Sequence, residues 1–386
     1  MVITRRWVER NLGFDPIATP APPSTFAFAA AKRSPSLEDL QREIIDFDSE
    51  GPEGAAFLAF TTATGLSRFS DIPWPEGLVP TPDKTPGKGP AGALPKADVL
   101  VVTWTVDEGH ALSRVLTPGK DSRNDYLSYT HNFATIAKKM RRGCPALLAK
   151  RLGAYWTTKI GGKSVVVFKS DSHMSQDGPQ LPNLDVWKQI IEETKPALVI
   201  TTGTAGGIGK QFEVGDVILS PLVRFDCQGK FKNKEIEGKP IRAAHYASVV
   251  PKTKYVAKAK TLFKANASQL PKDNTRPPNV FQTAPASLPS SVVTTDFFGF
   301  DTSDNHFGLK DLGHVSEMGD AVLGLAATEL AEPVRWVAVR NVSDPQIKAE
   351  GTIEQQAEVA AQIYKGFGRW SSVCSAIVCW ALIAAE

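Results

Sequence analysis

Short runs of apolar residues alternate along the chain with stretches in which apolar residues recur every three or four positions. The runs, which are typical of strands buried on both faces, cover residues 99–104, 164–168, 197–202, 214–220 and 336–342. Helical spacing occurs at 111–116, in a helix that Asn183 is expected to cap, at 319–330 and at 353–385. This alternation of strands and helices predicts an α/β domain with a largely parallel or mixed sheet.

The first quarter of the chain has a different pattern. Thirteen of the 28 prolines lie between Pro16 and Pro95, and glycines are set among them from Pro80 onward, which is typical of a linker. One firm helix is predicted there, with Ser36 as its cap and an apolar stripe over residues 37–45. We therefore expect residues 1–97 to form a proline-rich N-terminal extension and linker that lies against the main body or a partner subunit. Residues 98–386 are expected to form the main domain.

The composition argues against several classes of protein. Hydrophobic residues make up 42% and charged residues 22%, and the formal net charge of +3 gives no general attraction to nucleic acid or to an acidic membrane. The four cysteines are too few for a disulfide scaffold, and no zinc motif occurs, so we expect free thiols and no metal site. The apolar run at 373–385 is shorter than the roughly 20 residues of a membrane span and predicts a buried closing helix. Because no secretory signal follows the N-terminal arginines either, a cytoplasmic protein is expected.

A glycine-rich segment, residues 202–210, directly follows one predicted strand. Its glycines allow backbone N–H groups to approach a ligand closely. The segment is not a P-loop, because Gln211 follows Lys210 and Thr204 stands where the first glycine would be. It also fits the dinucleotide loop of short-chain dehydrogenases. Such a loop opens a helix, however, whereas residues 213–220 predict another strand almost at once.

Further segments occur in the order known from one family. Residues 203–208 followed by 214–220, then 294–298, 316–322 and 339–344, resemble motifs of the purine nucleoside phosphorylase and nucleosidase superfamily, and 99–116 resembles its first strand and helix. The resemblance covers residues 98–386, and it includes the methylthioadenosine/S-adenosylhomocysteine nucleosidases. It implies a three-layer αβα sandwich with a central mixed sheet, as in the nucleoside phosphorylases.

The resemblance also implies cleavage of the N-glycosidic bond of a purine nucleoside or nucleotide. That reaction passes through an oxocarbenium-like sugar, so it needs assistance to the leaving base and a nucleophile on the opposite face. Asp344, after a buried strand, is expected to assist the base. Glu108, where the first strand gives way to its helix, is expected to activate water. Because an acidic residue there would repel phosphate, hydrolysis is expected rather than phosphorolysis, without a cofactor.

Further site residues are implied by the same motifs. Thr204, Ala205 and Gly206 would line the pocket for base and ribose, Phe298 would stack on the base, and Met318 would pack beneath the sugar. All five belong to segments that carry the resemblance, so we expect them to lie close together.

One position departs from the family pattern. Where a carboxylate would bind the ribose diol, this chain has Gly319. Either Asp320 replaces that carboxylate, or the sugar is held differently, is not an ordinary ribose or is not bound productively. Glu317 is expected at the site, or in a structural role. Phe225 would belong to a pocket wall completed by a neighbouring subunit, as in the homo-oligomers of the family.

Plainer alternatives stand beside these assignments. Asp344 can be a turn residue before a proline, and Glu108 a first-turn glutamate favoured by the helix dipole. His173 lies in a polar loop from which it can contact the substrate. The basic residues between 138 and 151 form either a solvated face or an attraction for phosphorylated nucleotides. For the whole protein, a phosphorylase that uses inorganic phosphate and a non-catalytic purine or nucleotide sensor stay open.

Overall fold

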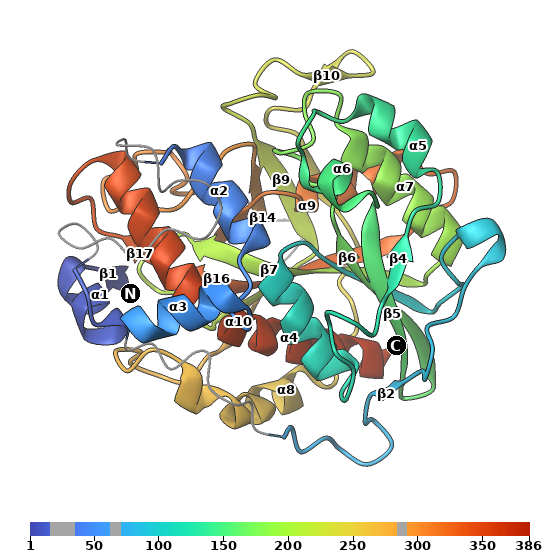
Figure 1. The fold of residues 1–386 in the computed structure, drawn as a ribbon, viewed down its shortest axis with the longest axis horizontal. Coiled ribbons are helices and arrows are strands. Elements are labelled where there is room, and N and C mark those ends of the chain that lie inside the picture. Colours follow the sequence, from blue (N-terminus) through green and yellow to red (C-terminus); the bar gives the residue numbers. More distant parts are fainter. Residues whose placement is uncertain (16–34, 62–70, 284–291) are drawn as a thin grey trace.

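The computed structural model describes residues 1–15, 35–61, 71–283 and 292–386, and a mixed sheet lies at its centre (Figure 1). The described strands of this sheet are β2 (Thr81–Pro82), β3 (Val99–Thr103), β4 (Leu127–Tyr129), β5 (Gly153–Ile160), β6 (Lys163–Ser170), β7 (Leu198–Gly207), β8 (Val217–Ser220), β9 (Leu222–Asp226), β12 (His245–Ala247), β13 (Val280–Gln282), β14 (Val292–Thr295), β15 (Val315–Glu317) and β16 (Arg335–Asp344). Two short strand pairs lie outside it, β1 (Val2–Ile3) with β17 (Gln346–Ile347) and β10 (Glu235–Ile236) with β11 (Lys239–Pro240). The α-helices are α1 (Arg5–Leu12), α2 (Leu37–Asp46), α3 (Pro52–Phe60), α4 (Val106–Leu116), α5 (Phe133–Ile136), α6 (Pro145–Ala149), α7 (Pro182–Thr194), α8 (Val256–Leu262), α9 (Asp320–Glu329) and α10 (Ile353–Ala385).

Strand β7 is central to the sheet, whose main path runs β12-β9-β14-β15-β7-β3-β6-β5-β2. Its first residues, 198–201, pair in parallel with β3, whereas Gly206 and Gly207 at its other end pair in antiparallel with β15. Strand β16 runs parallel to β7 over nearly its whole length. The carboxyl ends of β3, β7 and β16 therefore lie at the same edge of the sheet, and this edge carries the candidate site.

Alternating side chains along the strands build one core on each face of the sheet. Val99 and Val101 of β3 pack with α4, α8 and α10, whereas Leu100 and Val102 pack with α7 and α9. Successive side chains of a strand point to opposite faces, so one uninterrupted apolar run fills both cores. The predicted three-layer αβα sandwich is thereby confirmed, and Figure 1 shows these two groups of helices on opposite sides of the sheet.

Helix α10 closes one of these cores. It is long and apolar enough to cross a membrane by length and composition, but 94% of its most apolar 18-residue window is buried inside the protein. Thr352 caps its start, where the Thr352 side chain accepts a hydrogen bond from Gln355 N. The burial is that of a core helix, so the predicted closing helix at 373–385 is confirmed as the last part of α10.

The described parts of the N-terminal extension pack on the main body. Strand β1 pairs in parallel with β17, and β2 pairs in antiparallel with β5. Helix α2 begins after Ser36 with the predicted capping box, and Leu40, Ile44 and Ile45 are buried. Glu43 of α2 forms an ion pair with the buried Lys365 of α10. The extension thus lies against the chain's own body, while the domain boundary after residue 97 stays a prediction.

Two sequence-based expectations are corrected by the structure. Asn183 does not cap α7, because the helix begins at Pro182, which has no N–H to satisfy, and the buried Asn183 side chain has no hydrogen-bond partner within the described chain. Residues 202–207 of the glycine segment do not form a loop after β7 but are its last part, and only residues 208–210 lie beyond the strand. At Gly203, φ is 145° and a Cβ would lie 2.5 Å from the Glu108 carboxyl group, so glycine is needed for this close approach.

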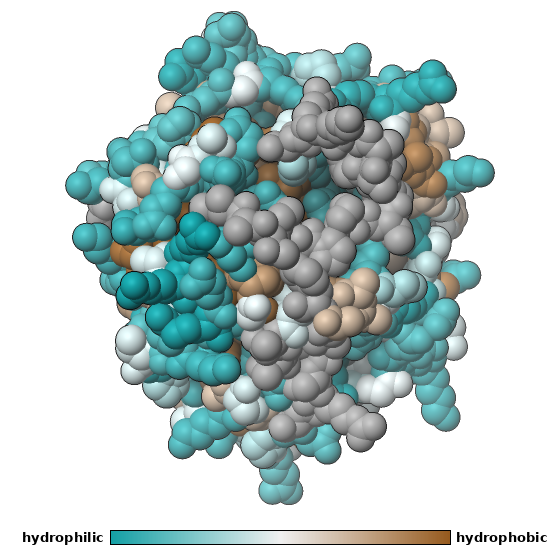
Figure 2. Space-filling view, turned by 60° about the vertical axis from the view of Figure 1, so that its left-hand side comes forward, coloured by the Kyte–Doolittle hydropathy of each residue, from teal (hydrophilic) through white to brown (hydrophobic). Residues whose placement is uncertain are grey.

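The surface of the side shown in Figure 2 is mostly hydrophilic, with small hydrophobic areas between the polar ones. The large hydrophobic residues that are exposed in the described parts of the chain are Val79, Leu148, Val249 and Val250. Most apolar side chains are therefore used inside the two sheet cores and in a third cluster, where α1 and α2 pack with the first half of α10.

Candidate active site

A pocket lies at the sheet edge where β3, β7 and β16 end. Its empty space, with adjoining solvent included, is about 700 Å³. Several distant segments line it: Gln41, Ile44 and Ile45 of α2, Trp104, Thr105 and Glu108 at the start of α4, His173 and Ser175 after β6, Thr204, Ala205 and Gly206 of β7, Phe298 and Gly299 after β14, Ser316, Glu317 and Met318 around β15, Arg340, Ser343 and Asp344 of β16, and Tyr364 of α10.

Asp344 brings a buried carboxyl group to this pocket at the last position of β16. Ser343 Oγ donates a hydrogen bond of 2.6 Å to Asp344 Oδ1. A Cβ on Gly206 would lie 3.0 Å from Asp344 Oδ2, so the glycine allows the carboxyl group to lie against β7. Burial raises the pKa of Asp344 to about 7. Asp344 therefore still holds a proton in a large share of molecules near neutral pH, as a general acid must.

Glu108 is a second buried carboxyl group and stands at the third position of α4, where it forms a capping box with Thr105. Its carboxylate accepts five hydrogen bonds: Oε1 from Thr204 N (2.8 Å) and Thr204 Oγ1 (2.7 Å), and Oε2 from Thr103 Oγ1 (2.8 Å), Trp104 N (3.1 Å) and Thr105 N (3.0 Å).

These contacts keep Glu108 ionised. Burial by itself would raise the pKa of Glu108, but Arg340 and the hydrogen bonds from Thr105 and Thr204 outweigh it and lower the pKa below its usual value. A carboxylate offers about four lone-pair sites, so its acceptor capacity is already used. Glu108 is thus a first-turn glutamate, as in the plainer alternative from the sequence, and it also lines the pocket.

Arg340 supplies a buried positive charge to the pocket. Its Nε donates to Asp320 Oδ2 (2.8 Å), and its Nη2 donates to Asp320 Oδ1 (2.5 Å) and Glu317 Oε2 (3.1 Å). Its Cζ lies 4.6 Å from the ring centroid of Trp104. Burial would lower the pKa of Arg340, but Asp320 and Glu317 outweigh it and raise the pKa, so the side chain stays charged.

Asp320 does not take the place of the missing diol carboxylate. It is fully buried beneath Arg340 and does not line the pocket, because both of its carboxylate oxygens bond the guanidinium group. At Gly319 a Cβ would lie 3.0 Å from Trp104 Cζ2, so the Trp104 ring fills the space next to this backbone. The expectation for Asp320 is therefore corrected, which leaves the alternatives that the sugar is held differently, is not an ordinary ribose or is not bound productively.

Glu317 combines the two roles that the sequence left open. It lines the pocket, and its carboxyl group accepts hydrogen bonds from Gly319 N (2.6 Å) and Asp320 N (2.9 Å) at the start of α9 and from Thr294 Oγ1 of β14. Burial and the neighbouring Asp320 carboxylate raise the pKa of Glu317. The side chain thus fixes the start of α9 while facing the pocket.

Of the remaining predicted site residues, five line the pocket and Phe225 does not. The pocket lining includes Thr204, Ala205, Gly206, Phe298 and Met318. Phe225 of β9 is not among the lining residues. It is fully buried in the core of its own chain, with its ring in edge contact with Tyr246 at a centroid distance of 6.2 Å. The expected role of Phe225 in a wall shared with a neighbouring subunit is corrected accordingly.

Sequence reasoning missed several lining residues. Gln41, Ile44 and Ile45 lie on a helix that the sequence predicted, but nothing in that helix indicates where it docks. Tyr364 lies in the first half of α10 and donates a 2.8 Å hydrogen bond to Thr105 Oγ1. Arg340 carried a detectable signal, because it is the charged residue in a predicted strand, 336–342, that is otherwise apolar except for Asn341.

His173, which the sequence placed within reach of the substrate, does line the pocket. Burial lowers the pKa of His173 to about 3, so its imidazole is neutral at physiological pH. Its backbone N donates to Asp177 Oδ2 (2.9 Å), and its Nε2 is buried with no hydrogen-bond partner in the described residues.

Three of the six basic residues between 138 and 151 form ion pairs with carboxylates. Lys139 pairs with Asp185, Arg141 with Glu38 of α2, and Arg151 with the buried Asp171. None of the basic residues of this segment lines the pocket. This arrangement favours a structural and surface role over the attraction of phosphorylated substrates.

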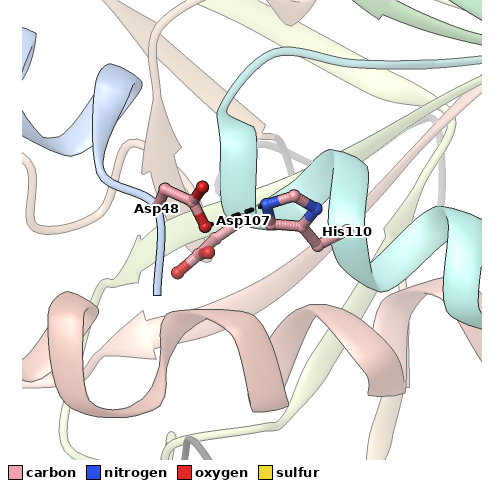
Figure 3. Close-up of side chains that lie close together, drawn as sticks. All are labelled: Asp48, Asp107 and His110. Atoms are coloured by element: carbon pink, nitrogen blue, oxygen red, sulfur yellow. Dashed lines mark hydrogen bonds and ion pairs between the residues drawn. The ribbon is translucent and has the colours of Figure 1, made fainter. Parts of the chain in front are cut away.

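Asp48, Asp107 and His110 form a cluster of potential metal ligands where the extension meets α4 (Figure 3). Asp48 Oδ1 lies 3.1 Å from His110 Nε2 and also accepts a hydrogen bond from Arg123 Nη2. Asp107 Oδ1 accepts hydrogen bonds from Ser49 N (2.9 Å) and Ser49 Oγ (2.6 Å). These contacts fasten the extension to α4 and account for the cluster as a structural junction.

Several solved structures of nucleosidases are similar to this chain. Among solved structures, the chain is similar to a 5′-methylthioadenosine/S-adenosylhomocysteine nucleosidase from Neisseria meningitidis in complex with methylthio-immucillin-A, with 16% identity, a TM-score of 0.43, and 75% of this chain and 100% of that chain covered. It is also similar to a futalosine hydrolase of Helicobacter pylori, with 12% identity, a TM-score of 0.44, and 74% and 96% covered. A nucleosidase from Colwellia psychrerythraea in complex with adenine has 13% identity and a TM-score of 0.42, with 75% and 95% covered. No curated protein matches by sequence.

A family model settles the wider relationship. The model of the phosphorylase superfamily matches residues 131–377, which is more than half of the chain and includes β7, β15 and β16 with their pocket residues. The resemblance predicted from the ordered motifs is thereby confirmed, and the chain belongs to the phosphorylase superfamily.

Proposed function

We propose that the protein is a hydrolase that cleaves the N-glycosidic bond of a purine nucleoside. The observation that carries the proposal is the pairing of two unlike carboxyl groups in one pocket. Asp344 has its pKa raised to about 7 by burial, whereas the pKa of Glu108 is lowered against the effect of burial by Arg340 and hydrogen bonds. Carboxyl groups whose environments separate their pKa values are suited to acid and base roles.

In the proposed reaction, the bond between the sugar C1′ and the base nitrogen breaks, and its electron pair goes to the base. Asp344 gives its proton to the base, and a water molecule attacks C1′ from the opposite face. Glu108 supplies negative charge near the oxocarbenium-like sugar and takes a proton from the water. For this to occur, a hydroxyl donor such as Thr204 Oγ1 turns away and frees a lone pair of Oε1. Phe298 offers an aromatic face for the base.

Hydrolysis is favoured over phosphorolysis by the charges of the pocket. Phosphate sites in proteins rely on charge-assisted donors, above all arginine and lysine. Among the described lining residues the permanent cation is Arg340, and Asp320 and Glu317 already hold its guanidinium group. The ionised Glu108 would in addition repel a phosphate dianion.

The test is release of free base by the purified protein from a panel of purine nucleosides that includes 5′-methylthioadenosine, with and without added phosphate. We expect release without phosphate, and a loss of at least roughly 100-fold in kcat/KM for Glu108→Gln. Release only in the presence of phosphate would contradict hydrolysis. Unchanged hydrolysis by Glu108→Gln would contradict the role of Glu108.

A second candidate, a non-catalytic purine sensor, is favoured by two observations. Glu108 already accepts five hydrogen bonds, and Gly319 removes a carboxylate that would hold the sugar. Tight binding of a nucleoside without release of base from any substrate would support this candidate. Glu108→Gln would then change the affinity little.

A further inference from the structure

The N-terminal extension reaches the pocket through helix α2. Three α2 residues line the pocket: Gln41 and, one helical turn later, Ile44 and Ile45. Residues at this spacing lie on one face of the helix. The three are buried, with exposed fractions of 2%, 5% and 3%. Both isoleucines present only hydrocarbon to the pocket, and Gln41 is uncharged. The wall that α2 forms is therefore free of charge.

Contacts with four separate parts of the main body fix this wall. Gln41 Nε2 donates a hydrogen bond to Ser175 Oγ, in the loop that also carries His173. Arg42 Nη2 donates to Gly143 O (2.7 Å), Glu43 pairs with Lys365 of α10, and Glu38 pairs with both Arg141 and Lys230. Three charged side chains of α2, Glu38, Arg42 and Glu43, thus hold the helix on the main body, while the residues that face the pocket are uncharged.

The opposite sides of the pocket add no cation that is available to a ligand. Arg340 is held by Asp320 and Glu317, and the remaining charged lining groups of the described chain are acids. A phosphate ester bound against Ile44 and Ile45 would lose its hydration and gain no charge-assisted partner, which is unfavourable for a dianion.

We infer that α2 of the extension is a specificity element of the substrate site, and that it selects an uncharged purine nucleoside with an apolar substituent over a nucleotide. This inference rests on the proposed function and deepens it. Ile44 and Ile45 contact the part of the substrate that reaches α2, and Gln41 sets the position of that wall by its bond to Ser175.

The test compares variants of α2 in the full-length protein. Ile44→Ala and Ile45→Ala are each expected to raise KM for the best nucleoside roughly 3- to 10-fold, because apolar contact with the ligand is lost. Leu40→Ala is the matched control, since Leu40 is buried on the same helix without lining the pocket. It is expected to lower stability while leaving KM within about twofold of the wild-type value.

A charge placed in the wall tests the selectivity. Ile45→Lys is expected to shift the ratio of kcat/KM for the nucleoside 5′-monophosphate over that for the nucleoside by at least roughly tenfold toward the nucleotide. An unchanged ratio, or equal KM changes in Ile45→Ala and Leu40→Ala, would overturn the inference while hydrolysis by the wild type stands.

If the wild type releases no base, the proposed function fails. Calorimetric binding of the nucleoside to the same variants then tests the α2 wall: weakening in Ile45→Ala but not in Leu40→Ala supports it, and equal affinities refute it.

Discussion

At the scale of single residues, the chemistry of the pocket depends on how the chain treats its buried acids. Asp344 has few polar neighbours and its pKa rises to about 7, whereas Glu108 is surrounded by donors and stays ionised. The two groups differ in environment and not in chemical type. Substitution of Asp344 therefore has consequences for activity and for stability that point in opposite directions.

Asp344→Asn is expected to lower kcat/KM for base release by roughly 10²- to 10⁴-fold, because the amide cannot deliver a proton as the carboxyl group does. In the wild type, kcat/KM is expected to fall as the pH rises through about 7, where Asp344 loses its proton. The measurement is a pH–rate profile of both proteins. A wild-type profile that is flat between pH 6 and 8 would contradict the role of Asp344 as an acid.

The same variant is expected to be more stable than the wild type at pH 8. Asp344 binds a proton in the native state up to a pKa of about 7, while the unfolded group releases it near the ordinary value of 3.8. The native state thus holds more protons between these values, so the wild type loses stability as the pH rises through this window. The asparagine side chain carries no charge, so at pH 8 the gain in the free energy of unfolding is on the order of 4 kcal/mol. Urea unfolding at pH 5 and pH 8 checks this, and equal pH slopes in the two proteins would contradict it.

At the scale of secondary-structure elements, the close approach of β7 to α4 holds Glu108 in place. Gly203→Ala would put a Cβ at φ 145° and 2.5 Å from the Glu108 carboxyl group. We expect a loss in the free energy of unfolding of roughly 1–3 kcal/mol from backbone strain, together with loss of base release because Glu108 must move. Gly162→Ala is the control, since Gly162 also has a positive φ of 83° but no atom lies within 4 Å of its Cβ position.

The control separates strain from contact. Gly162→Ala should lower stability and leave base release unchanged, as measured by urea unfolding and by kcat/KM. Equal activity in the two variants would show that Glu108 does not need its present position.

The sequence predicts an element where the pattern that specifies it lies in neighbouring residues, and not where it depends on partners far along the chain. Continuous apolar runs predicted β3, β6, β7, β8 and β16, and the Ser36 capping box predicted α2, because period and caps are written into neighbouring residues. The local pattern did not show that β7 continues through its glycines, since the partners of that stretch, β15 and β16, are more than a hundred residues away.

The candidate site follows the same rule. Residues within ordered motifs, such as Thr204, Phe298 and Asp344, were predicted as site residues and line the pocket. Ile44 and Ile45 were predicted only as an apolar helix face, because docking of α2 depends on tertiary contacts with α10 and with the loop after β6. Asp320 was misassigned because its buried partner, Arg340, lies 20 residues further along.

At the scale of the whole molecule, the extension and the main body are expected to unfold together. Buried contacts cross between them at several points: Lys365 with Glu43, Asp107 with Ser49, and β1 with β17. Regions that share a core and buried polar contacts usually unfold in one cooperative transition. In urea, the transitions followed by tryptophan fluorescence and by far-UV circular dichroism should therefore coincide.

Glu43→Gln tests this coupling, because it removes the charge that faces Lys365, a lysine side chain only 4% exposed. Breaking a buried ion pair from one side costs roughly 3–5 kcal/mol, and the whole transition should shift to lower urea while remaining single. Glu9→Gln is the control, since the Arg5–Glu9 pair on the same extension is about half exposed and contributes little. If the extension unfolds first, in a separate transition that alone responds to Glu43→Gln, then it is an independent unit. In that case α2 could unfold and leave the pocket without its α2 wall while the sheet stays folded.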